Sequence, residues 1–252
     1  MLLDRLLINS GNFPPTLIFN EGWLLRLVLD WVCKNEKGLS IIEFSENSSW
    51  FSEGLLSTPF HHRTRHDKLA EGKTHADGIL GHFILNNGSK ADIKPIENGE
   101  LFSVFEAKIF SSFSPGTKYF PEFNQVSRYI SCMAYLHSEY PQEKNDYQQF
   151  FFSAVFPSER SSEHEFLINL EKEKIFNDVS KRIEAYQTED RYQDFDKLSI
   201  WFKSQFAPFL EKVVIRQITW ESIIEEISSF DISFAEQLDS YYQKCLNHNR
   251  QT

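Results

Sequence analysis

The sequence contains little cysteine, no long apolar run and a shortage of positive charge. The three cysteines, Cys33, Cys132 and Cys245, stand far apart and form no Cys-x-x-Cys pair, which argues against a disulfide framework. We expect them to be buried, reduced thiols. No stretch approaches the roughly 18 consecutive apolar residues of a membrane-spanning helix, and the N-terminal segment lacks the small-residue cleavage site of a secretory signal. These absences predict a cytoplasmic protein with no membrane contact.

The charge balance is acidic. Lys and Arg total 26 and Asp and Glu total 36, so the formal net charge is −10. Non-specific affinity for nucleic acid comes mainly from Lys and Arg, so this balance argues against a protein that binds DNA strongly by itself. It does not exclude a nuclease, because divalent cations bound in an active site would offset the acids there.

Length and composition are sufficient for a sizeable core. The chain has 252 residues, of which 41% are hydrophobic, and it contains 24 Phe. This size fits one domain with an elaboration, or two small domains.

The most informative stretch is residues 102–110, Phe-Ser-Val-Phe-Glu-Ala-Lys-Ile-Phe. Its apolar, aromatic-rich composition predicts a strand over residues 101–110. In a strand, residues i and i+2 point to the same face, so Glu106 and Lys108 would project side by side, about 6–7 Å apart along the backbone. Burying two charges in such a run is costly unless they are paired or hold a metal, which makes the pair a candidate site.

Two further segments complete a recognisable pattern. Asp77 lies upstream, in the stretch Thr-His-Ala-Asp-Gly-Ile-Leu. Downstream, a predicted helix carries Gln125 and Tyr129 four residues apart, so both lie on one helical face. An Asp, a later Glu-x-Lys strand and a following Gln-x-x-x-Tyr helix resemble the PD-(D/E)XK nuclease superfamily, in the branch that includes recombination exonucleases. The three pieces occur in the expected order within about residues 20–156.

This resemblance implies an α/β fold with the restriction-endonuclease-like αβββαβ core, in which helices flank a mixed central sheet. We place the nuclease-like core at residues 1–157 and a mainly helical C-terminal elaboration, packed on the core, at residues 158–252. The predicted helices cover 21–34, 122–138, 163–187, 191–212, 221–227 and 231–247, and the predicted strands cover 39–44, 76–85, 101–110, 150–156 and 213–219, with an irregular polar segment at 45–73.

The resemblance also implies a metal site. Mg²⁺ or Mn²⁺ would be held by the carboxylates of Asp77 and Glu106 and by the backbone carbonyl of Ala107, since these hard cations prefer oxygen ligands. Many relatives carry an acidic residue on the first helix, so Glu21 would extend the site. A first-turn acid that only stabilises its helix is the competing interpretation of Glu21.

Three more residues receive roles from the resemblance. Lys108 would orient or help to deprotonate the attacking water, or stabilise the phosphate. Gln125 would lie beside the metal, and Tyr129 would help to position the substrate or neighbouring residues. The competing interpretation is a structural salt bridge between Glu106 and Lys108 on an edge strand.

The sequence departs from the family pattern in two ways. Ala76 precedes Asp77 where the motif has proline, and a second Asp-x-Lys pair, Asp92 and Lys94, lies closer to Asp77 than the preferred pair does. We prefer Glu106 and Lys108 because their flanks are strand-like and the Gln-x-x-x-Tyr helix follows directly. Asp92 lies between Asn-Asn-Gly and Pro, which favours an excursion between strands.

A histidine-rich segment allows a zinc site, but no cysteine pair accompanies it, and a polar loop is the better interpretation. The same segment is the most basic part of the chain, so we expect phosphate contacts there if DNA is bound. Its histidines are His61, His62, His66 and His75, and its basic residues are Arg63, Arg65 and Lys68.

The sequence thus predicts a metal-dependent DNA nuclease that hydrolyses phosphodiester bonds, with a role in restriction or phage defence by family analogy only. Two alternatives stay open: a nuclease-fold subunit that acts as an interaction protein within a larger complex, which the acidic balance favours, and an RNA-cleaving nuclease. Since paired cuts on duplex DNA often need two active sites, a homodimer is an expectation from the family.

Overall fold

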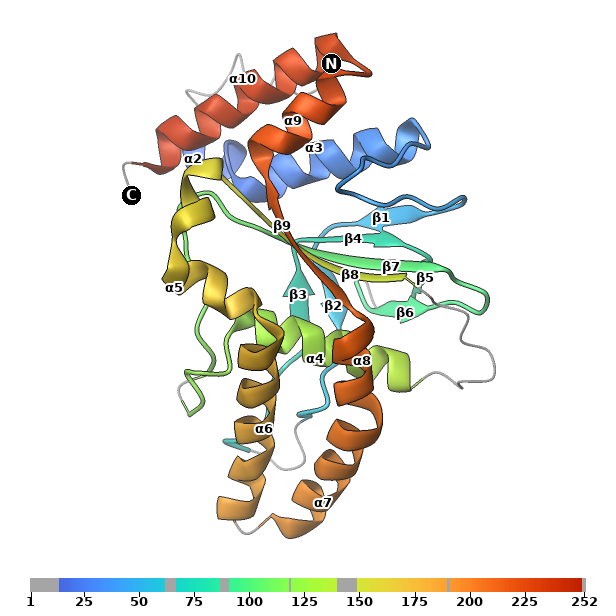
Figure 1. Ribbon diagram of the computed structural model, residues 1–252, viewed down its shortest axis with the longest axis vertical. Coiled ribbons are helices and arrows are strands. Elements are labelled where there is room, and N and C mark those ends of the chain that lie inside the picture. The colour runs from blue at the N-terminus through green and yellow to red at the C-terminus, as the bar shows by residue number, and fades with distance from the viewer. Residues whose placement is uncertain are drawn as a thin grey trace.

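The computed structural model describes residues 14–61, 67–86, 91–117, 119–139, 149–189 and 191–250. It confirms the coarse fold class: the protein is a mixed α/β structure whose central sheet of five strands is flanked by helices on both faces (Figure 1). Within the described ranges, no helix has the length and apolar character needed to cross a bilayer.

The central sheet is mixed, with the strand order β1-β4-β7-β8-β9. The pairs β1–β4 and β4–β7 are antiparallel, whereas β7–β8 and β8–β9 are parallel. Two small antiparallel sheets, β2–β3 and β5–β6, lie beside it. The strands are β1 (Ser49–Phe51), β2 (Gly54–Leu56), β3 (Thr74–Ala76), β4 (Gly78–Gly81), β5 (Phe83–Leu85), β6 (Ile93–Pro95), β7 (Leu101–Ala107), β8 (Gln149–Phe156) and β9 (Val214–Thr219).

Helices cover each face of this sheet. In Figure 1, α3, α9 and α10 lie on one side, and α4, α6, α7 and α8 lie on the other. The helices are α2 (Pro15–Ile18), α3 (Glu21–Lys34), α4 (Gln125–Ser138), α5 (His164–Leu167), α6 (Lys172–Thr188), α7 (Tyr192–Trp201), α8 (Ala207–Lys212), α9 (Trp220–Ser228) and α10 (Ile232–Asn249), with short 3₁₀ turns η3 (Ser158–Ser162) and η4 (Ile168–Leu170) and a π-helical turn η5 (Phe202–Phe206).

The central strand β7 shows why the core divides into two clusters. Phe102 and Val104 point into the cluster beneath α4, while Phe105 and Ala107 point into the cluster beneath α3. Glu106 belongs by alternation to the α4 side. All seven residues of β7 are buried, and so is Lys108 directly after the strand, so the charged groups of Glu106 and Lys108 both lie inside the protein.

The predicted strand over 76–85 is wrong as a single element. The chain instead forms β3, β4 and β5, with breaks at Asp77 and His82. Gly81 has φ +132°, and a Cβ there would collide with the Leu101 carbonyl, so the backbone turns where only glycine fits. The ring of His82 then accepts the amide hydrogen of Leu101 at 3.2 Å, which fills the gap in the ladder.

Two other expectations are corrected near the N-terminus. The segment predicted as a strand at 39–44 contains only an isolated bridge between Leu39 and Ile42. The segment 45–73, predicted to be irregular, contributes β1 to the edge of the central sheet and β2 to a hairpin with β3. Both strands are three residues long, too short for a sequence pattern to indicate.

The part after residue 157 is mainly helical but also completes the sheet. β9 pairs in parallel with β8 from Phe151↔Val214 to Phe156↔Thr219, so both predicted parts of the chain contribute to one sheet. α9 and α10 return across the face covered by α3, and Trp220 at the start of α9 donates a hydrogen bond to the Lys108 carbonyl at 2.9 Å. The C-terminal segment therefore supports the end of β7 directly.

Candidate active site

The candidate residues meet at one end of the sheet, where β7 ends and α4 begins. Asp77 occupies the bend between β3 and β4, and β4 runs antiparallel to β7, so this bend lies beside the C-terminal end of β7. Gln125 is the first residue of α4, whose N-terminus is capped by Asn124 through a bond from the Ser127 amide at 3.1 Å. Sheet pairing and helix capping thus fix where the side chains meet.

Glu106 makes a contact with each of its carboxylate oxygens. The ammonium Nζ of Lys108 lies 2.5 Å from Oε1, and the hydroxyl of Tyr129 lies 2.6 Å from Oε2. The Tyr129 hydroxyl is also 2.6 Å from the carbonyl oxygen of His75. One phenolic proton cannot serve both acceptors at once, so the Tyr129 hydroxyl lies between two competing acceptors, the His75 carbonyl and the Glu106 carboxylate.

Asp77 and Glu106 form a pair of interacting carboxyl groups. Burial, and then the charge of Glu106, raise the pKa of Asp77 from 3.8 to about 8. Burial likewise raises the pKa of Glu106, against the lowering effects of Lys108, Tyr129 and a hydrogen bond with Asp77. The amide of Ala107 donates to Oδ2 of Asp77 at 2.9 Å and holds this carboxyl group at the end of β7. The two carboxyl groups are therefore coupled, because the charge of Glu106 makes the ionisation of Asp77 less favourable.

Gln125 joins the site to the loop that follows β7. Its Oε1 accepts the amide hydrogen of Ser114 at 3.0 Å, and its Nε2 lies 3.4 Å from the Tyr129 hydroxyl. The residues predicted as catalytic, Asp77, Glu106, Lys108, Gln125 and Tyr129, are therefore connected through a continuous set of polar contacts.

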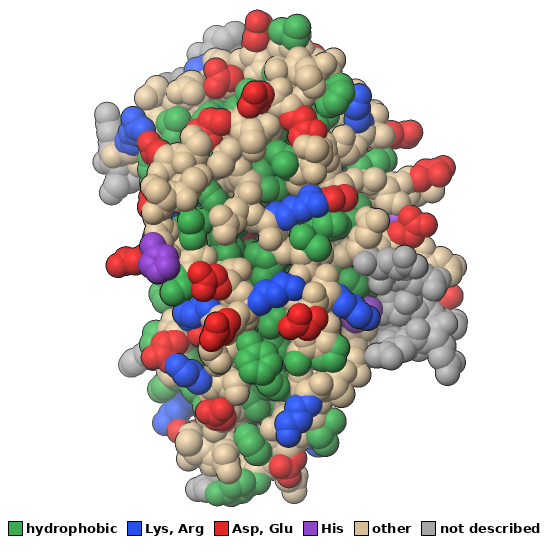
Figure 2. All heavy atoms as spheres, viewed as in Figure 1, with side chains coloured by type: hydrophobic (Ala, Val, Ile, Leu, Met, Phe, Trp, Pro, Cys, Tyr) green, Lys and Arg blue, Asp and Glu red, His purple; other side chains and the backbone are tan. Residues whose placement is uncertain are grey.

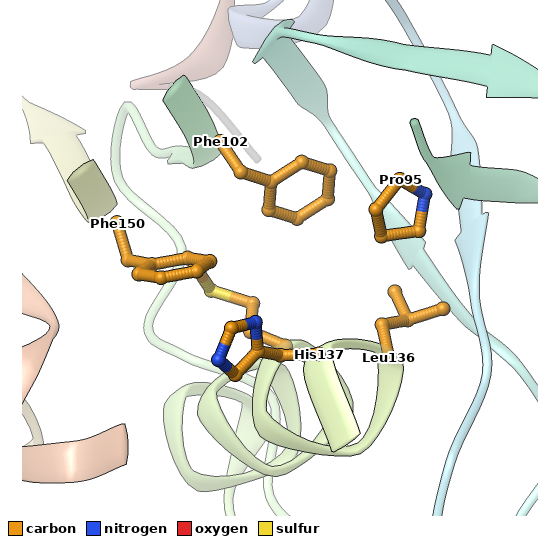
Figure 3. Close-up of a pocket in the computed structure, with 6 residues that line it drawn as sticks. Pro95, Phe102, Leu136, His137 and Phe150 are labelled. Carbon is orange, nitrogen blue, oxygen red and sulfur yellow. The ribbon is translucent and has the colours of Figure 1, made fainter. Parts of the chain in front are cut away.

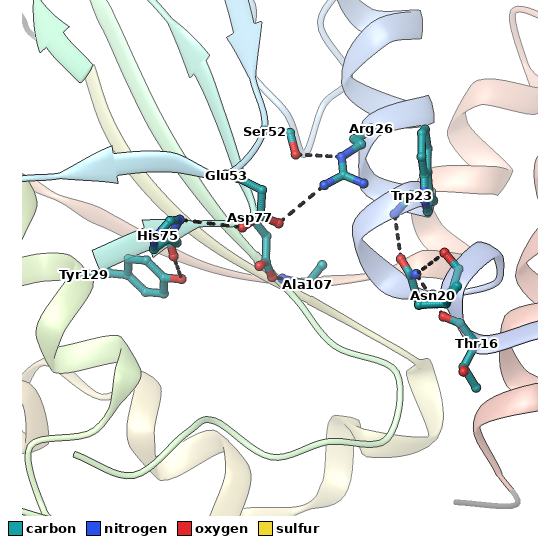
Figure 4. A network of polar contacts seen from close by, with 11 residues as sticks. Thr16, Asn20, Trp23, Arg26, Ser52, Glu53, His75, Asp77, Ala107 and Tyr129 are labelled. Atoms are coloured by element: carbon teal, nitrogen blue, oxygen red, sulfur yellow. Dashed lines mark hydrogen bonds and ion pairs between the residues drawn. The ribbon is translucent and has the colours of Figure 1, made fainter. Parts of the chain in front are cut away.

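Glu53 is a neighbour that the sequence did not indicate. It lies in the turn between β1 and β2 with φ +58°, and its negative charge contributes to the raised pKa of Asp77. Arg26 of α3 reaches its carboxylate at 3.4 Å, and His75 approaches from the other side at 3.9 Å (Figure 4). Its only sequence signal is a short Ser-Glu-Gly turn, which is too common to single out.

Glu21 begins α3, as predicted, and its charge adds to the effect of burial in raising the pKa of the Cys245 thiol of α10. Its role as a further metal ligand stays a prediction. The acids whose charges raise the pKa of Asp77 are Glu106 and Glu53, so Glu53 is an additional acidic neighbour of the site.

The competing pair is not beside Asp77. Asp92 forms an ion pair with Lys73, and Lys94 belongs to β6 of a separate small sheet. Both line a cleft with Leu136 and Glu139, at the opposite end of α4 from Gln125. The structure therefore brings Glu106 and Lys108, and not Asp92 and Lys94, to Asp77.

Part of the histidine-rich segment lies outside the described residues, namely His62, Arg63, Arg65 and His66. Of its described members, His61 lies 3.1 Å from the Tyr135 hydroxyl, Lys68 lies over the ring of Tyr119, and His75 faces Glu53. These three side chains face different partners.

The donor set fits a hard divalent cation. Within the described ranges, no cluster of three His, Cys, Asp or Glu side chains is arranged around a common point, so protein carboxylates would supply two ligands, from Asp77 and Glu106. Mg²⁺ is commonly held by one or two carboxylates, with water completing its shell. A cation would also offset the electrostatic repulsion between these two carboxyl groups.

A small apolar cavity lies at the other end of α4, between Phe102, Phe150 and His137 (Figure 3). Its volume is about 10 Å³, which leaves room for no more than one water molecule. It is a packing defect rather than a ligand site.

No protein-family model matches this chain, and neither the curated proteins nor the solved structures yield a match.

Proposed function

We propose that this protein is a metal-dependent DNA nuclease of the PD-(D/E)XK type. The observation that carries the proposal is the convergence of Asp77 with the Glu106–Lys108 ion pair at the end of β7, where Tyr129 of α4 also contacts Glu106. A structural salt bridge on an edge strand would not explain this, because β7 is the middle strand of the sheet and a second, half-buried acid, Asp77, lies beside the pair.

The order of elements supports the same conclusion. Helix α3, the antiparallel strands β1, β4 and β7, helix α4 and the parallel strand β8 follow one another in the sequence and lie in the sheet order β1-β4-β7-β8. This order supports the αβββαβ arrangement that the sequence resemblance implies, and β9 lies at one edge of the sheet.

Each side chain has a task in phosphodiester hydrolysis. The cation would neutralise charge at the phosphate and lower the pKa of a bound water. Asp77 and Glu106 would hold it, and Ala107 would keep Asp77 in place through its amide. Lys108, which lies beside Glu106, would orient the attacking water or stabilise charge on the phosphate.

A second candidate is a nuclease-fold subunit that works only within a larger complex. The favouring observation is electrostatic: the net charge is −10, and on the face shown in Figure 2 Lys and Arg side chains alternate with Asp and Glu. A partner subunit would then supply the positive surface that a polyanion needs. A role in restriction or phage defence, and a homodimer, are further parts of the proposal that rest on family analogy.

The test is cleavage of supercoiled, linear and single-stranded DNA, and of RNA, in Mg²⁺ or Mn²⁺ with EDTA as the control. Lys108→Ala should abolish cleavage, whereas the matched Asp92→Ala should retain it. Loss of activity in Asp92→Ala with retention in Lys108→Ala would move the site to β6. Absence of cleavage by the wild type on every substrate would favour the partner-dependent subunit.

A further inference from the structure

A cleft opens directly beside the candidate catalytic residues. It has a volume of about 340 Å³ and lies between the segment 70–75, Thr117 and the first turns of α4. Gln125 and Tyr129 form part of its wall, and Arg128 of the same helix completes it. A ligand in this cleft would therefore lie beside Tyr129, which touches Glu106, and beside Gln125, which touches Tyr129.

Basic side chains lie in and near the wall of this cleft. Arg128 and Lys73 are among its lining residues, and Lys73 is paired with Asp92. The wall also contains Glu71, whose pKa is raised by burial against the charges of Arg182 and then Arg128. Arg182 is not a lining residue but forms an ion pair with Glu71, so Arg128 is the cation that faces a ligand in the cleft.

Several polar atoms at this wall lack partners. Among the described residues, Nε of Arg128 and Oγ1 of Thr117 are buried and make no hydrogen bond. The same holds for Oε1 of Glu71, whose nearest cation, Nε of Arg182, lies 3.6 Å away, and for Nε of Arg182 itself. Buried donors without acceptors cost free energy, so a side-chain rotation that brings Arg128 or Thr117 to an acceptor in the cleft would be favoured.

The N-terminus of α4 adds to the attraction. This helix has 14 residues, and its first turn lies at the cleft through Gln125 and Arg128. Helix N-termini favour negative charge, because the backbone amide groups there point outward with a partial positive charge.

We infer that this cleft binds a phosphate of the nucleic-acid strand next to the cleaved bond, with Arg128 as its cationic ligand and Thr117 as a hydroxyl donor. The inference rests on the proposed function for its position relative to the cleaved bond. Phosphate contacts of this kind set the register of the strand and carry no sequence information, so the cleft would serve DNA of any sequence.

The test measures binding separately from cleavage. A labelled single-stranded DNA oligonucleotide is titrated with the full chain in EDTA, at a series of KCl concentrations, and fluorescence anisotropy reports binding. Arg128→Ala should weaken binding about tenfold and reduce the salt dependence of the association constant by about one ion. Arg128→Lys should keep the salt dependence, and Lys34→Ala, a charge removed from an exposed site at the C-terminal end of α3, should change neither quantity.

A second variant guards against misfolding. Thr117→Val removes only the hydroxyl while keeping the shape of the side chain, and it should weaken binding with little change in thermal unfolding. In cleavage assays, Arg128→Ala should act mainly through KM. A purely structural role for Arg128 would lower the unfolding temperature but would leave the salt dependence of binding unchanged.

The outcomes separate this inference from the proposed function. Oligonucleotide binding that depends on Arg128 in a protein that cleaves nothing would overturn the nuclease and retain the phosphate cleft. Metal-dependent cleavage with unchanged binding and KM in Arg128→Ala would retain the nuclease and overturn the cleft. A wild-type protein that binds no oligonucleotide would also overturn the cleft.

Discussion

The ammonium group of Lys108 lies 2.5 Å from the Glu106 carboxylate, and the two side chains are 9% and 1% exposed. Two charges this deeply buried are tolerated because they compensate each other and because Tyr129 contacts the remaining carboxylate oxygen. The pair therefore has measurable consequences for stability as well as for catalysis.

Breaking the ion pair from one side should be costly. Lys108→Met removes the charge but keeps the length of the side chain, so Glu106 loses its cation and the protein should lose about 3 kcal/mol of unfolding free energy. Glu106→Gln should be destabilising for the same reason. The double variant should be more stable than the sum of the single changes predicts, with a coupling of about 1–3 kcal/mol in urea unfolding. Additive effects would show that the two side chains do not interact.

Asp77→Asn should stabilise the protein near neutral pH when no divalent cation is present. The folded protein holds the Asp77 proton up to a pKa of about 8, whereas the unfolded chain releases it near 3.8, so wild-type stability falls as pH rises between these values. The neutral side-chain amide of the variant carries no such cost, so we expect its free energy of unfolding to exceed that of the wild type by about 2 kcal/mol at pH 7–8. The measurement is urea unfolding in EDTA from pH 5 to 8. Equal pH dependence in the two proteins would contradict it.

The same pair of proteins tests the metal site without relying on activity. Mg²⁺ should raise the unfolding temperature of the wild type, because a cation that binds only the folded state stabilises it. It should have little effect on Asp77→Asn. An equal shift in both proteins would place the bound cation elsewhere.

Tyr129→Phe should damage both stability and catalysis. The hydroxyl contacts the His75 carbonyl and the Glu106 carboxylate, each at 2.6 Å, and its removal leaves buried acceptors without a donor. A loss of about 1–2 kcal/mol in unfolding free energy is expected. In cleavage assays kcat should fall with little change in KM, since the ring still packs on Phe152. Unaltered kcat would remove Tyr129 from the catalytic set.

Glu53 allows its backbone and its charge to be tested separately. Glu53→Gly suits the φ of +58° and should stabilise the protein by up to about 1 kcal/mol, less the lost contact with Arg26. Glu53→Gln keeps the strained backbone but removes the charge. Both variants should lower the pH at which Asp77 ionises, which the pH dependence of unfolding reports. Only the glycine variant should gain stability from the backbone.

His137 provides a pH effect of opposite sign, far from the candidate site. Burial lowers the pKa of this histidine from 6.5 to about 4, as its ring packs on Phe150 with 4.8 Å between centroids. The unfolded chain therefore binds a proton that the folded protein refuses, and stability should fall as pH drops from 6.5 towards 4. In His137→Phe this part of the pH dependence should disappear. Thermal unfolding at pH 4.5 and 7 would show it as a difference from the wild type.

The sequence indicated the elements that carry strong patterns. The apolar run at 101–110 became β7, and the helix expected at 122–138 became α4. These predictions succeeded because a long apolar strand and an amphipathic helix have distinct periodicities that do not depend on distant partners. The sequence likewise gives the order of the candidate site residues along the chain, which are Asp77, Glu106, Lys108, Gln125 and Tyr129.

Short elements were not readable in this way. β1 and β2 have three residues each, and the break at His82 depends on a glycine with a left-handed backbone against a neighbouring strand. Such features are set by the partner strand rather than by local preference, so no sequence pattern predicts them.

By itself the sequence determined which residue types were available and that Glu106 and Lys108 would share one face of a strand, because side-chain alternation is a property of the extended backbone. Only the tertiary structure decided which second acid would face them. The antiparallel pairing of β4 with β7 brings in Asp77, and the turn after β1 adds Glu53, whereas Asp92 lies towards the far end of α4. Distances between residues far apart in the chain follow from strand register and helix packing, which burial of the whole core selects.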